Sequence, residues 1–364
     1  MAHELRGAAA IVGIGLTEFG EHPGRSQTEI MAEAVHYALT DAGVTKDQVD
    51  GVFGSDFQNP LISLTMAEYL GISPKMLDGT NIGGSSFVNC IQSASMAIRT
   101  GVCEVALIAY GSNSRTGGRR GIPGQVPYEH VYKLRNPINS YALAASRHMY
   151  QYGTTRAQLA AVAVSARAWA QKNPRAFMRD PLSVEDVLNS RKVVDPFTVR
   201  DCCLVTDAGA AIVMVAADRA GDFPQKPAYV LGIGAAATHN QIARMPDLTV
   251  TGVAPSAPRA LAMAEVTLDD VDVVELYDAF TINTLMFMED LGYCAKGEGG
   301  PFIESGAIAP GGSIPVNTNG GGLSCVHPGM YGLFLIVEAV EQLRGACGER
   351  QIEGAEIALC NGNG

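Results

Sequence analysis

Four residues that commonly move protons stand in short motifs of the C-terminal half of the chain. They are Tyr277 in ELYDAFT, His327 and Tyr331 in VHPGMYG, and Cys360 in CNG. Tyrosine, histidine and cysteine act as general acids or bases when their surroundings bring the pKa toward neutral pH. Glycine in two of these motifs lets the backbone approach a substrate. These residue types indicate acid/base chemistry.

A further motif, DGTNIGGSSF at residues 78–87, predicts a tight turn that opens an Ala-rich helix. Unpaired N–H groups and the positive dipole at a helix N-terminus favour anions and thiolates, so such a turn suits a nucleophile. The nearest cysteine, Cys90, falls a full helical turn further on. Ser85 and Ser86 are expected to cap the helix, and the chain has no G-x-S-x-G pattern. A covalent nucleophile is therefore missing from a place that suits one.

The composition indicates a globular protein that does not bind nucleic acid. With 364 residues, 47% hydrophobic and 17% charged, the chain can bury a large core, and its length suggests about two domains. The formal charge of −11 opposes binding to phosphate backbones. The scattered cysteines, with no CxxC pair and no HExxH motif, argue against disulfides and a metal site. With no signal-like start and no long apolar run, we expect a cytoplasmic location and no membrane span.

An internal repeat divides the chain into two similar halves. VTKDQVD at 44–50 returns as VTLDDVD at 266–272, with five of seven positions identical. Upstream, AAIVGIG at 9–15 corresponds to AYVLGIG at 228–234. Each half reads strand, helix, strand, helix, strand, which predicts an α/β fold with largely parallel sheets buried on both faces. The second helix of each half is apolar on nearly every face, as a helix between two sheets must be.

This plan resembles the thiolase superfamily over essentially the whole chain. The resemblance is carried by the turn at 78–87, by DPFTVRDCCLVTDAGAAIVMV at 195–215, by ELYDAFT at 275–281, by NTNGGGLSCVHPGMYG at 317–332 and by CNG at 360–362. It implies a thiolase fold, in which duplicated βαβαβ halves form a five-layer α/β/α/β/α sandwich with an inserted loop domain.

The resemblance also implies domain boundaries. Residues 1–111 and 195–220 are expected to form the N-terminal half, 112–194 a loop or cap insertion, and 221–364 the C-terminal half. Thiolase relatives run on beyond the Cys-x-Gly motif with a final strand, which this chain lacks after CNGNG. Because an open strand edge exposes unpaired backbone groups, we expect something to cover it, and a partner subunit is one answer.

The departures from the thiolase pattern decide the expected function. Asn81 aligns with the cysteine that accepts the acyl group in thiolases, and an amide cannot form a thioester. YDAFT and HPGMYG instead resemble the lipid-transfer-protein-like branch, whose members are retro-aldolases of β-hydroxyacyl-CoA in steroid side-chain degradation. The resemblance therefore implies a lyase that yields a ketone and a shortened acyl-CoA. The turn is expected to remain as scaffold and oxyanion geometry.

In that branch two tyrosines are implicated in catalysis, and they map onto Tyr277 and Tyr331. A tyrosine is a plausible base only if its pKa is lowered from about 10 or if it works in a proton relay. Tyr331 is slightly favoured because it stands at an expected helix N-terminus, where a phenolate is stabilised. For Tyr277 the alternative is a core aromatic that is hydrogen-bonded through its hydroxyl.

The resemblance assigns roles to other residues of these motifs. His327 corresponds to the oxyanion-hole histidine, although Val326 replaces the usual preceding glycine. Cys360 falls on the acid/base cysteine and either protonates the enolate or simply packs. Asp278 orients a neighbour or, as we favour, caps the following helix. The remaining expected substrate contacts, alongside Asn81, are the glycines Gly321 and Gly322.

Cofactor, partners and rival functions complete the expectations. No cofactor is expected beyond the coenzyme A of the substrate, whose phosphates would meet Arg115, Arg119 and Arg120 unless these merely form a solvated loop. The resemblance implies a homodimer that joins a small OB-fold, zinc-ribbon protein in a heterotetramer. One rival is a thiolase or acyltransferase that uses Cys90 or Cys360 as nucleophile. The other is a non-catalytic acyl-CoA or lipid carrier.

Overall fold

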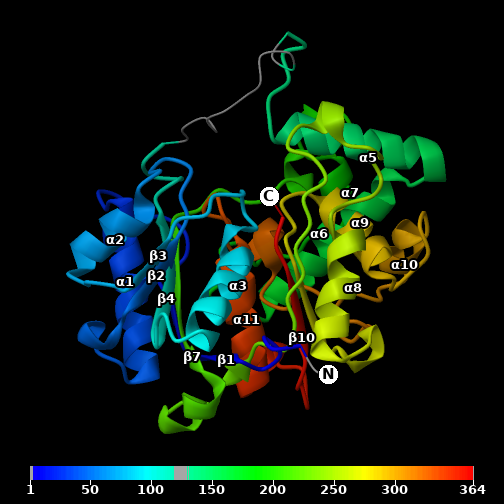
Figure 1. Cartoon of the computed structure of the whole chain (residues 1–364). Helices are drawn as coiled ribbons and strands as arrows, with labels where there is room; N and C mark the ends of the chain where they lie inside the picture. The colour runs from blue at the N-terminus through cyan, green and yellow to red at the C-terminus, as the bar shows by residue number, and fades with distance from the viewer. Residues whose placement is uncertain (1–2, 119–128, 130, 364) are drawn as a thin grey trace.

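The secondary-structure elements stack in five layers (Figure 1). The computed structural model describes residues 3–118, 129 and 131–363, so Arg119 and Arg120 lie outside the described residues. From one side to the other, the layers are α1 with α2, a six-stranded sheet, the central helices α3 and α11, the strands β9 and β10, and an outer layer that includes α8. This confirms the predicted α/β sandwich.

Three strands of the described residues have eight or nine residues, and the others have two to four. They are β1 (Ala9–Leu16), β2 (Gly51–Gly54), β3 (Met76–Asp78), β4 (Val105–Ser112), β5 (Lys192–Val194), β6 (Phe197–Thr198), β7 (Ala208–Ala216), β8 (Ala228–Tyr229), β9 (Val273–Leu276) and β10 (Ala358–Asn361).

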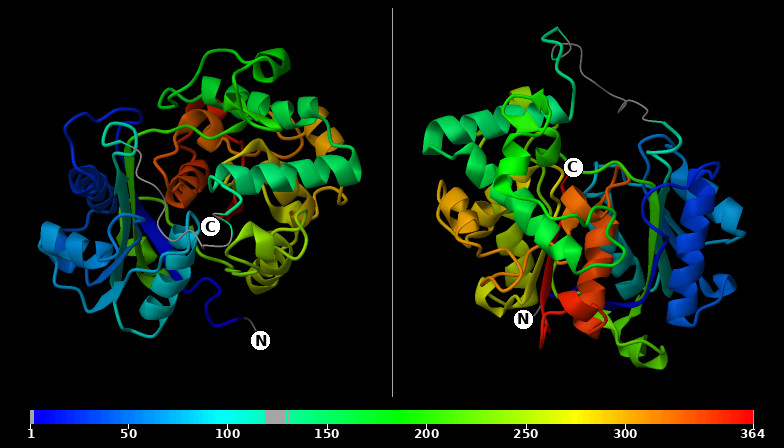
Figure 2. Two further views of the ribbon diagram at one scale, coloured as in Figure 1. Left: turned by 90° about the horizontal axis from the view of Figure 1, so that it is seen from above. Right: turned by 180° about the vertical axis from the view of Figure 1, so that it is seen from behind.

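The helices alternate with these strands. They are α1 (Gln27–Ala42), α2 (Ile62–Leu70), α3 (Ser86–Arg99), α5 (Ile138–Tyr152), α6 (Arg156–Gln171), α7 (Val184–Leu188), α8 (Val253–Ala264), α9 (Thr281–Leu291), α10 (Gly299–Glu304), the π-helix η6 (Gly321–Cys325) and α11 (Gly332–Arg344). Seven short 3₁₀ or π segments in all connect the longer elements of the described chain. The views in Figure 2 place α5 and α6 over the second half of the chain, and α6 packs against α9, α10 and η6.

The six-stranded sheet has the order β3-β2-β4-β7-β1-β8. Strand β2 is parallel to β3 and β4, but β7 is antiparallel to both β4 and β1, and β8 is antiparallel to β1. The expectation of largely parallel pairing was therefore wrong for this sheet. The chain leaves the sheet at the end of β4, forms α5 to α7, and re-enters at the same end, so that β7 must run in the opposite direction.

The internal repeat is visible in how glycines seat a helix on each half. A side chain at Gly13 or Gly15 would collide with backbone atoms of α1, 2.4 Å from the Ala38 oxygen or 2.1 Å from the Ala34 oxygen. Gly232 and Gly234 stand in the same relation to α8, with backbone oxygens 2.1 Å from the position of a β-carbon. The matching GIG sequences thus do the same work in both halves, which is close helix packing.

The second half forms a smaller sheet than the first. Strand β10 pairs in parallel with β9, and among the described residues these two strands form a separate two-stranded sheet. The central helix α11 packs against both of them and against α3, and most of its side chains are buried, as its apolar sequence predicts. No helix of the described residues combines the length and the apolar character that a membrane crossing requires.

Candidate active site

The sequence motifs meet where β9 ends, next to the N-termini of the two central helices. The ring of Tyr277, which directly follows β9, lies over Gly84 in the turn before α3, where a β-carbon would fall 2.2 Å from its Cζ and Oη atoms. A β-carbon at Gly332, the first residue of α11, would fall 2.5 Å from the Gly84 oxygen. A β-carbon at Gly362, after β10, would fall 2.7 Å from the Cα of Ser85. The turn, YDAF, HPGMYG and CNG therefore form one site.

Three aromatic side chains form the centre of this site. The ring centroids of Tyr277, His327 and Tyr331 lie 5.6 to 5.8 Å apart in all three pairs. Tyr277 meets the other two edge-on, whereas His327 and Tyr331 are nearly parallel, at 26°. All three residues are buried. The structure thus brings together the two tyrosines and the histidine that the sequence singled out.

The hydroxyl groups of the two tyrosines are held in different ways. The Tyr277 Oη accepts a hydrogen bond of 3.0 Å from the backbone N–H of Tyr331, the residue that precedes the first turn of α11. The Tyr331 hydroxyl instead donates its proton to Asn319 Oδ1, also at 3.0 Å. The oxygen at the N-terminus of α11 is therefore that of Tyr277, which corrects the reason for favouring Tyr331. Tyr277 keeps its own proton free for another group.

Burial sets the charge state of both phenols. It raises the pKa of Tyr277 well above its ordinary value, an effect that the N–H of Tyr331 partly opposes. Burial also raises the pKa of Tyr331, and the nearby Asp278 carboxyl adds to that rise. A lowered tyrosine pKa, the first of the two alternatives named for a catalytic tyrosine, is therefore not found, and both phenols are neutral at pH 7. Of the two, Tyr277 has the donor that stabilises a phenolate, so it suits a proton relay better.

Asp278 organises the glycine loop, residues 320–322, rather than the following helix. Its carboxylate accepts the N–H groups of Gly322, at 2.6 Å, and Leu323, at 3.2 Å, while α9 begins after Phe280. The favoured role as a cap of the following helix was thus wrong, because these N–H groups belong to η6. Gly321 has a φ of +66° and leaves only 2.0 Å between a would-be β-carbon and Asp278 Oδ2. Together these contacts fix the glycine loop beside His327.

Asp278 predicts a pH dependence of stability. Burial raises its pKa from 3.8 to about 7. Because the folded protein binds this proton more tightly than the unfolded chain, the contribution is complete below about pH 4 and is lost as the pH rises through 7. Between these limits the unaltered protein should lose at most about 4 kcal/mol of unfolding free energy, and Asp278→Asn should abolish this loss. Urea unfolding at pH 4 and pH 8 measures it.

The exposed Asp222 provides the matched control. Asp222→Asn should leave the difference between the two pH values as it is in the unaltered protein. An equal pH dependence in Asp278→Asn and the unaltered protein would contradict the role of the Asp278 carboxyl.

His327 is held by its backbone against the strand-end segment before β7. Its N–H donates to Thr206 Oγ1 at 3.1 Å, and its carbonyl accepts the N–H of Thr206 at 3.3 Å. A side chain at Gly322 would lie 3.0 Å from the His327 ring, so the glycine gives the imidazole its place. The ring is therefore fixed between the two tyrosines and the glycine loop, which suits a donor to a developing oxyanion.

The two cysteines named as rival nucleophiles, Cys90 and Cys360, are unsuited to that role. Cys90 is completely buried in α3, and burial raises its pKa to about 12. Cys360 lies on β10 opposite Glu275 of β9, and its thiol contacts the Leu335 carbonyl oxygen at 3.7 Å. Burial raises the pKa of Cys360 well above its ordinary value, and the Glu275 carboxyl adds to that rise. A thiol in such surroundings packs rather than attacks.

Three further expectations concern the turn and the coenzyme A contacts. Asn81 is exposed, and its amide donates to the Asp56 carbonyl oxygen at 3.0 Å, so the residue of the turn that meets Tyr277 is Gly84. Ser85 occupies the N-cap position without making a capping bond, because its hydroxyl donates to the Ile82 oxygen. Arg115 is bound to Glu21 at 2.6 Å and lies over the Phe177 ring. These contacts leave Arg115 poorly placed for phosphate binding.

Two residues that support the site had no separate signal in the sequence. Asn319 Oδ1 accepts hydrogen bonds from the Tyr331 hydroxyl and from the N–H of Gly321, at 2.7 Å. It therefore connects Tyr331 to the glycine loop. Tyr110 of β4 donates to the Pro328 oxygen at 2.8 Å, beside His327. The Asn-Gly-Gly sequence hinted at Asn319, whereas Tyr110 reads as an ordinary strand residue.

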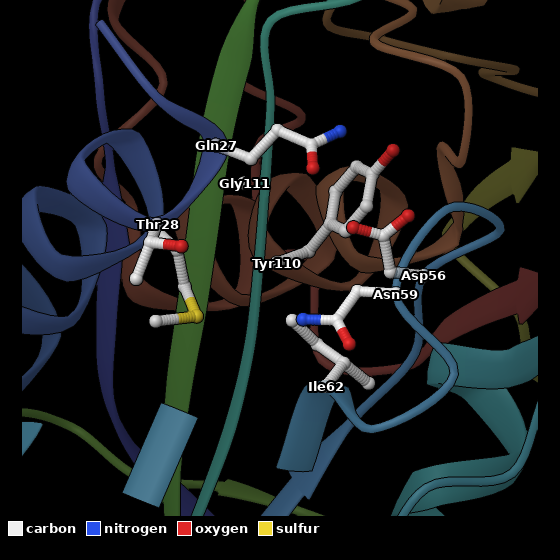
Figure 3. Close-up of a pocket in the computed structure, with 8 residues that line it drawn as sticks. Gln27, Thr28, Asp56, Asn59, Ile62, Tyr110 and Gly111 are labelled. Carbon is white, nitrogen blue, oxygen red and sulfur yellow. The ribbon is translucent and has the colours of Figure 1, made fainter. Parts of the chain in front are cut away.

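A small cavity lies behind Tyr110. Figure 3 shows Gln27, Asp56 and Asn59 around the Tyr110 ring, and the remaining lining residues are Thr28, Met31, Ile62 and Gly111. Its free space of about 20 Å³ holds a single water molecule and no acyl chain. This cavity is therefore too small to be the substrate site.

The contact of Tyr277 with Gly84 gives a second prediction. We expect Gly84→Ala to lower kcat by about 10²-fold, because the new methyl group must displace the Tyr277 ring by roughly an ångström. Steady-state kinetics measures this loss. Gly221→Ala is the control, since no atom lies within 4 Å of its added methyl group. Equal activity of the two variants would show that Tyr277 does not need its present position.

Comparisons with known proteins return one family model for the C-terminal part of the chain and several relatives that match nearly all of it. A family model described as "Thiolase C-terminal domain-like" matches residues 234–364. The chain is 33% identical to a steroid side-chain-cleaving aldolase of Thermomonospora curvata, over 99% of this chain and 96% of that protein. It is 36% identical to 17-hydroxy-3-oxo-4-pregnene-20-carboxyl-CoA lyase of Mycobacterium tuberculosis, over 94% and 92% of the two chains.

Identity alone does not separate two kinds of chemistry. The chain is also 34% identical to an acetyl-CoA acetyltransferase of Methanothermobacter thermautotrophicus, over 98% of this chain and 96% of that protein. Among solved structures, the one described as "Ltp2-ChsH2(DUF35) aldolase" superposes with a TM-score of 0.90 at 32% identity, over 99% of this chain and 96% of that chain. The residues of the site must decide between cleavage and acyl transfer.

Proposed function

The chain belongs to the thiolase superfamily, in its lipid-transfer-protein-like branch, and from this premise we propose that it is an acyl-CoA retro-aldolase. The substrate is a β-hydroxyacyl-CoA with a bulky, steroid-like side chain, in keeping with the relatives named above. The products are a ketone and a shortened acyl-CoA. The single observation that carries the proposal is the turn before α3, where the Tyr277 hydroxyl lies over Gly84 and no thiol is present.

The proposed reaction needs a base, an oxyanion site and a proton donor. Tyr277 is a neutral phenol and acts as a proton relay. Its oxygen accepts the proton of the β-hydroxyl group as the bond between the α- and β-carbons breaks, and its own phenol proton passes to the α-carbon. The pair of electrons from that bond passes to the α-carbon and gives a thioester enolate, while the β-carbon becomes the ketone. His327 donates a hydrogen bond to the enolate oxygen, and such a donor contributes roughly 10²- to 10³-fold in rate. Arrival of the phenol proton at the α-carbon completes the shortened acyl-CoA.

Tyr331 has a supporting part in this scheme. Its backbone N–H stabilises the Tyr277 oxygen, while its hydroxyl is tied to Asn319. The reaction uses side-chain and backbone groups, and coenzyme A enters only as part of the substrate. Cys360 serves as packing between β10 and α11, because its thiol lies against the Leu335 carbonyl oxygen.

A comparison of two substrates tests the proposal. The protein is given a tertiary β-hydroxyacyl-CoA of a steroid side chain without free CoA, and separately a β-ketoacyl-CoA with free CoA. We expect cleavage of the first and no thiolysis of the second. Thiolysis alone would establish the acyltransferase alternative. Tight binding of both without turnover, alone and with a partner, would favour a carrier.

The proposed assembly is a homodimer that carries a DUF35-type partner with an OB-fold and a zinc ribbon, as a heterotetramer. The aldolase structure described above names a DUF35 component. In this chain, β3 is one edge strand of the six-stranded sheet, and large apolar side chains between 39% and 62% exposed gather around it at Leu61, Leu64, Leu77 and Ile82. A second copy that covers β3 would bury them.

Leu64→Glu should yield monomers in size-exclusion chromatography, and an unchanged dimer would place the interface elsewhere.

A further inference from the structure

A third tyrosine approaches the site from the helices that cover it. Tyr141 lies in the first turn of α5, and its ring packs on Phe280 of the YDAF motif, with centroids 4.7 Å apart. Phe280 in turn stacks on Phe197 at 5.5 Å. Tyr141 comes from a distant part of the chain. Its ring is nevertheless fixed against Phe280, which stands three residues after Tyr277 in the motif.

The hydroxyl group of Tyr141 is also fixed. It accepts a hydrogen bond from the Asn363 amide. A phenol oxygen that accepts from an amide keeps its own proton for another group. No acceptor for that proton is found among the described residues, although the side chain as a whole is only partly buried.

The groups around the Tyr141 hydroxyl belong to the same site as Tyr277. The Cys203 N–H donates to the Ala279 oxygen at 2.8 Å, so Cys203 lies beside the YDAF motif, and its thiol raises the pKa of both Tyr277 and Tyr141. Gly362, the neighbour of Asn363, lies against Ser85 of the turn. Tyr141 thus stands between α5, the YDAF motif and the end of β10.

We propose that Tyr141 is a substrate-contacting residue, whose hydroxyl donates a hydrogen bond to the β-oxygen of the acyl group. That oxygen is a hydroxyl in the substrate and a ketone in the product. As Tyr277 removes the proton, the donor from Tyr141 stabilises the negative charge that develops on the oxygen. The inference rests on the proposed retro-aldol function and adds to it a residue that recognises the oxygenated carbon.

The test compares Tyr141→Phe with Tyr150→Phe. Tyr150 lies on the same helix but is 84% exposed, so its variant controls for a change in α5 itself. We expect Tyr141→Phe to lower kcat/KM by roughly 10²-fold. Its phenyl ring keeps the packing on Phe280, so the melting temperature should stay near that of the unaltered protein. Tyr150→Phe should leave both quantities unchanged.

Direct binding separates recognition from a structural role. Dissociation constants are measured by calorimetry for a β-ketoacyl-CoA and for a saturated acyl-CoA of the same skeleton without the β-oxygen. Tyr141→Phe should weaken only the oxygenated ligand, by about tenfold or more. Equal weakening of both ligands, or of neither, would overturn the proposal. If the unaltered protein cleaves nothing, the retro-aldol function fails, and this difference in binding still decides the role of Tyr141.

Discussion

Tyr277→Phe is expected to lower kcat by about 10²- to 10⁴-fold, the range that removal of a positioned acid or base produces. The substitution deletes only the oxygen that lies at the N-terminus of α11 and over the turn before α3. It therefore removes the group that accepts the substrate proton, while the ring contacts with His327 and Tyr331 remain. Steady-state kinetics on the β-hydroxyacyl-CoA measures kcat and KM separately.

The loss should fall on kcat rather than on KM, because the missing oxygen acts in the transition state. The variant also leaves the Tyr331 N–H without an acceptor, at a cost of about 1–3 kcal/mol in unfolding free energy. The melting temperature must therefore be measured with the kinetics. Tyr293→Phe is the control, since the hydroxyl of Tyr293 is buried without a partner among the described residues. A Tyr277→Phe variant with a normal kcat would exclude Tyr277 as the base.

The second large effect is expected on stability, from Arg350. This residue is only 4% exposed and binds Glu338 through two nitrogens, at 2.9 and 3.0 Å, and Glu341 at 2.8 Å. Arg350→Met leaves the buried Glu338 carboxylate without its cation, while the partly buried Glu341 keeps its ion pair with Arg175. We expect a loss of about 3–5 kcal/mol in unfolding free energy, measured by urea denaturation.

An arginine at the surface serves as the matched control for Arg350. Arg219 binds Glu104 at 2.9 Å, but the two side chains are 44% and 66% exposed. Arg219→Met should therefore cost no more than about 1 kcal/mol. Adding Glu338→Gln to Arg350→Met should restore part of the stability, because it removes the charge that was left unpaired. Similar losses for the two arginine variants would show that the buried network contributes nothing special.

This network also reaches the active site. Thr318 donates its hydroxyl to Glu338 at 2.7 Å and its N–H to Glu275 at 3.0 Å. The next residue, Asn319, accepts the Tyr331 hydroxyl. We therefore expect the Arg350 variant to lose activity at temperatures where it is still mostly folded, because the loop that carries Asn319 loses its support.

Much of the fold was predictable because its elements show a regular hydrophobic pattern along the sequence. The GIG repeats, the Thr-Lys-Asp and Thr-Leu-Asp segments and the apolar central helices all occupy equivalent places in the two halves. The direction of β7 was not predictable in this way, since it depends on where a long insertion returns to the sheet. Local sequence carries little information about such returns.

The members of the site were predictable, but their hydrogen bonds were not. Tyr277, His327 and Tyr331 stand in recognisable motifs and do meet. Which tyrosine oxygen lies at the N-terminus of α11 depends on a contact between residues 54 positions apart. The partner of Asp278 is likewise a loop 44 positions away, so a local capping rule assigned it to the wrong helix. Tyr141 escaped notice because nothing in α5 resembles a catalytic motif.

The most direct test of the account is a mass-spectrometric measurement on a reaction run in D₂O without free CoA. The protein is mixed with the β-hydroxyacyl-CoA, and both the small molecules and the intact protein are weighed after quenching. The account predicts a ketone, a shortened acyl-CoA with one deuterium on its α-carbon, and a protein of unchanged mass. A protein that carries an acyl group, or product that forms only after CoA is added, would contradict it and return the chemistry to a cysteine.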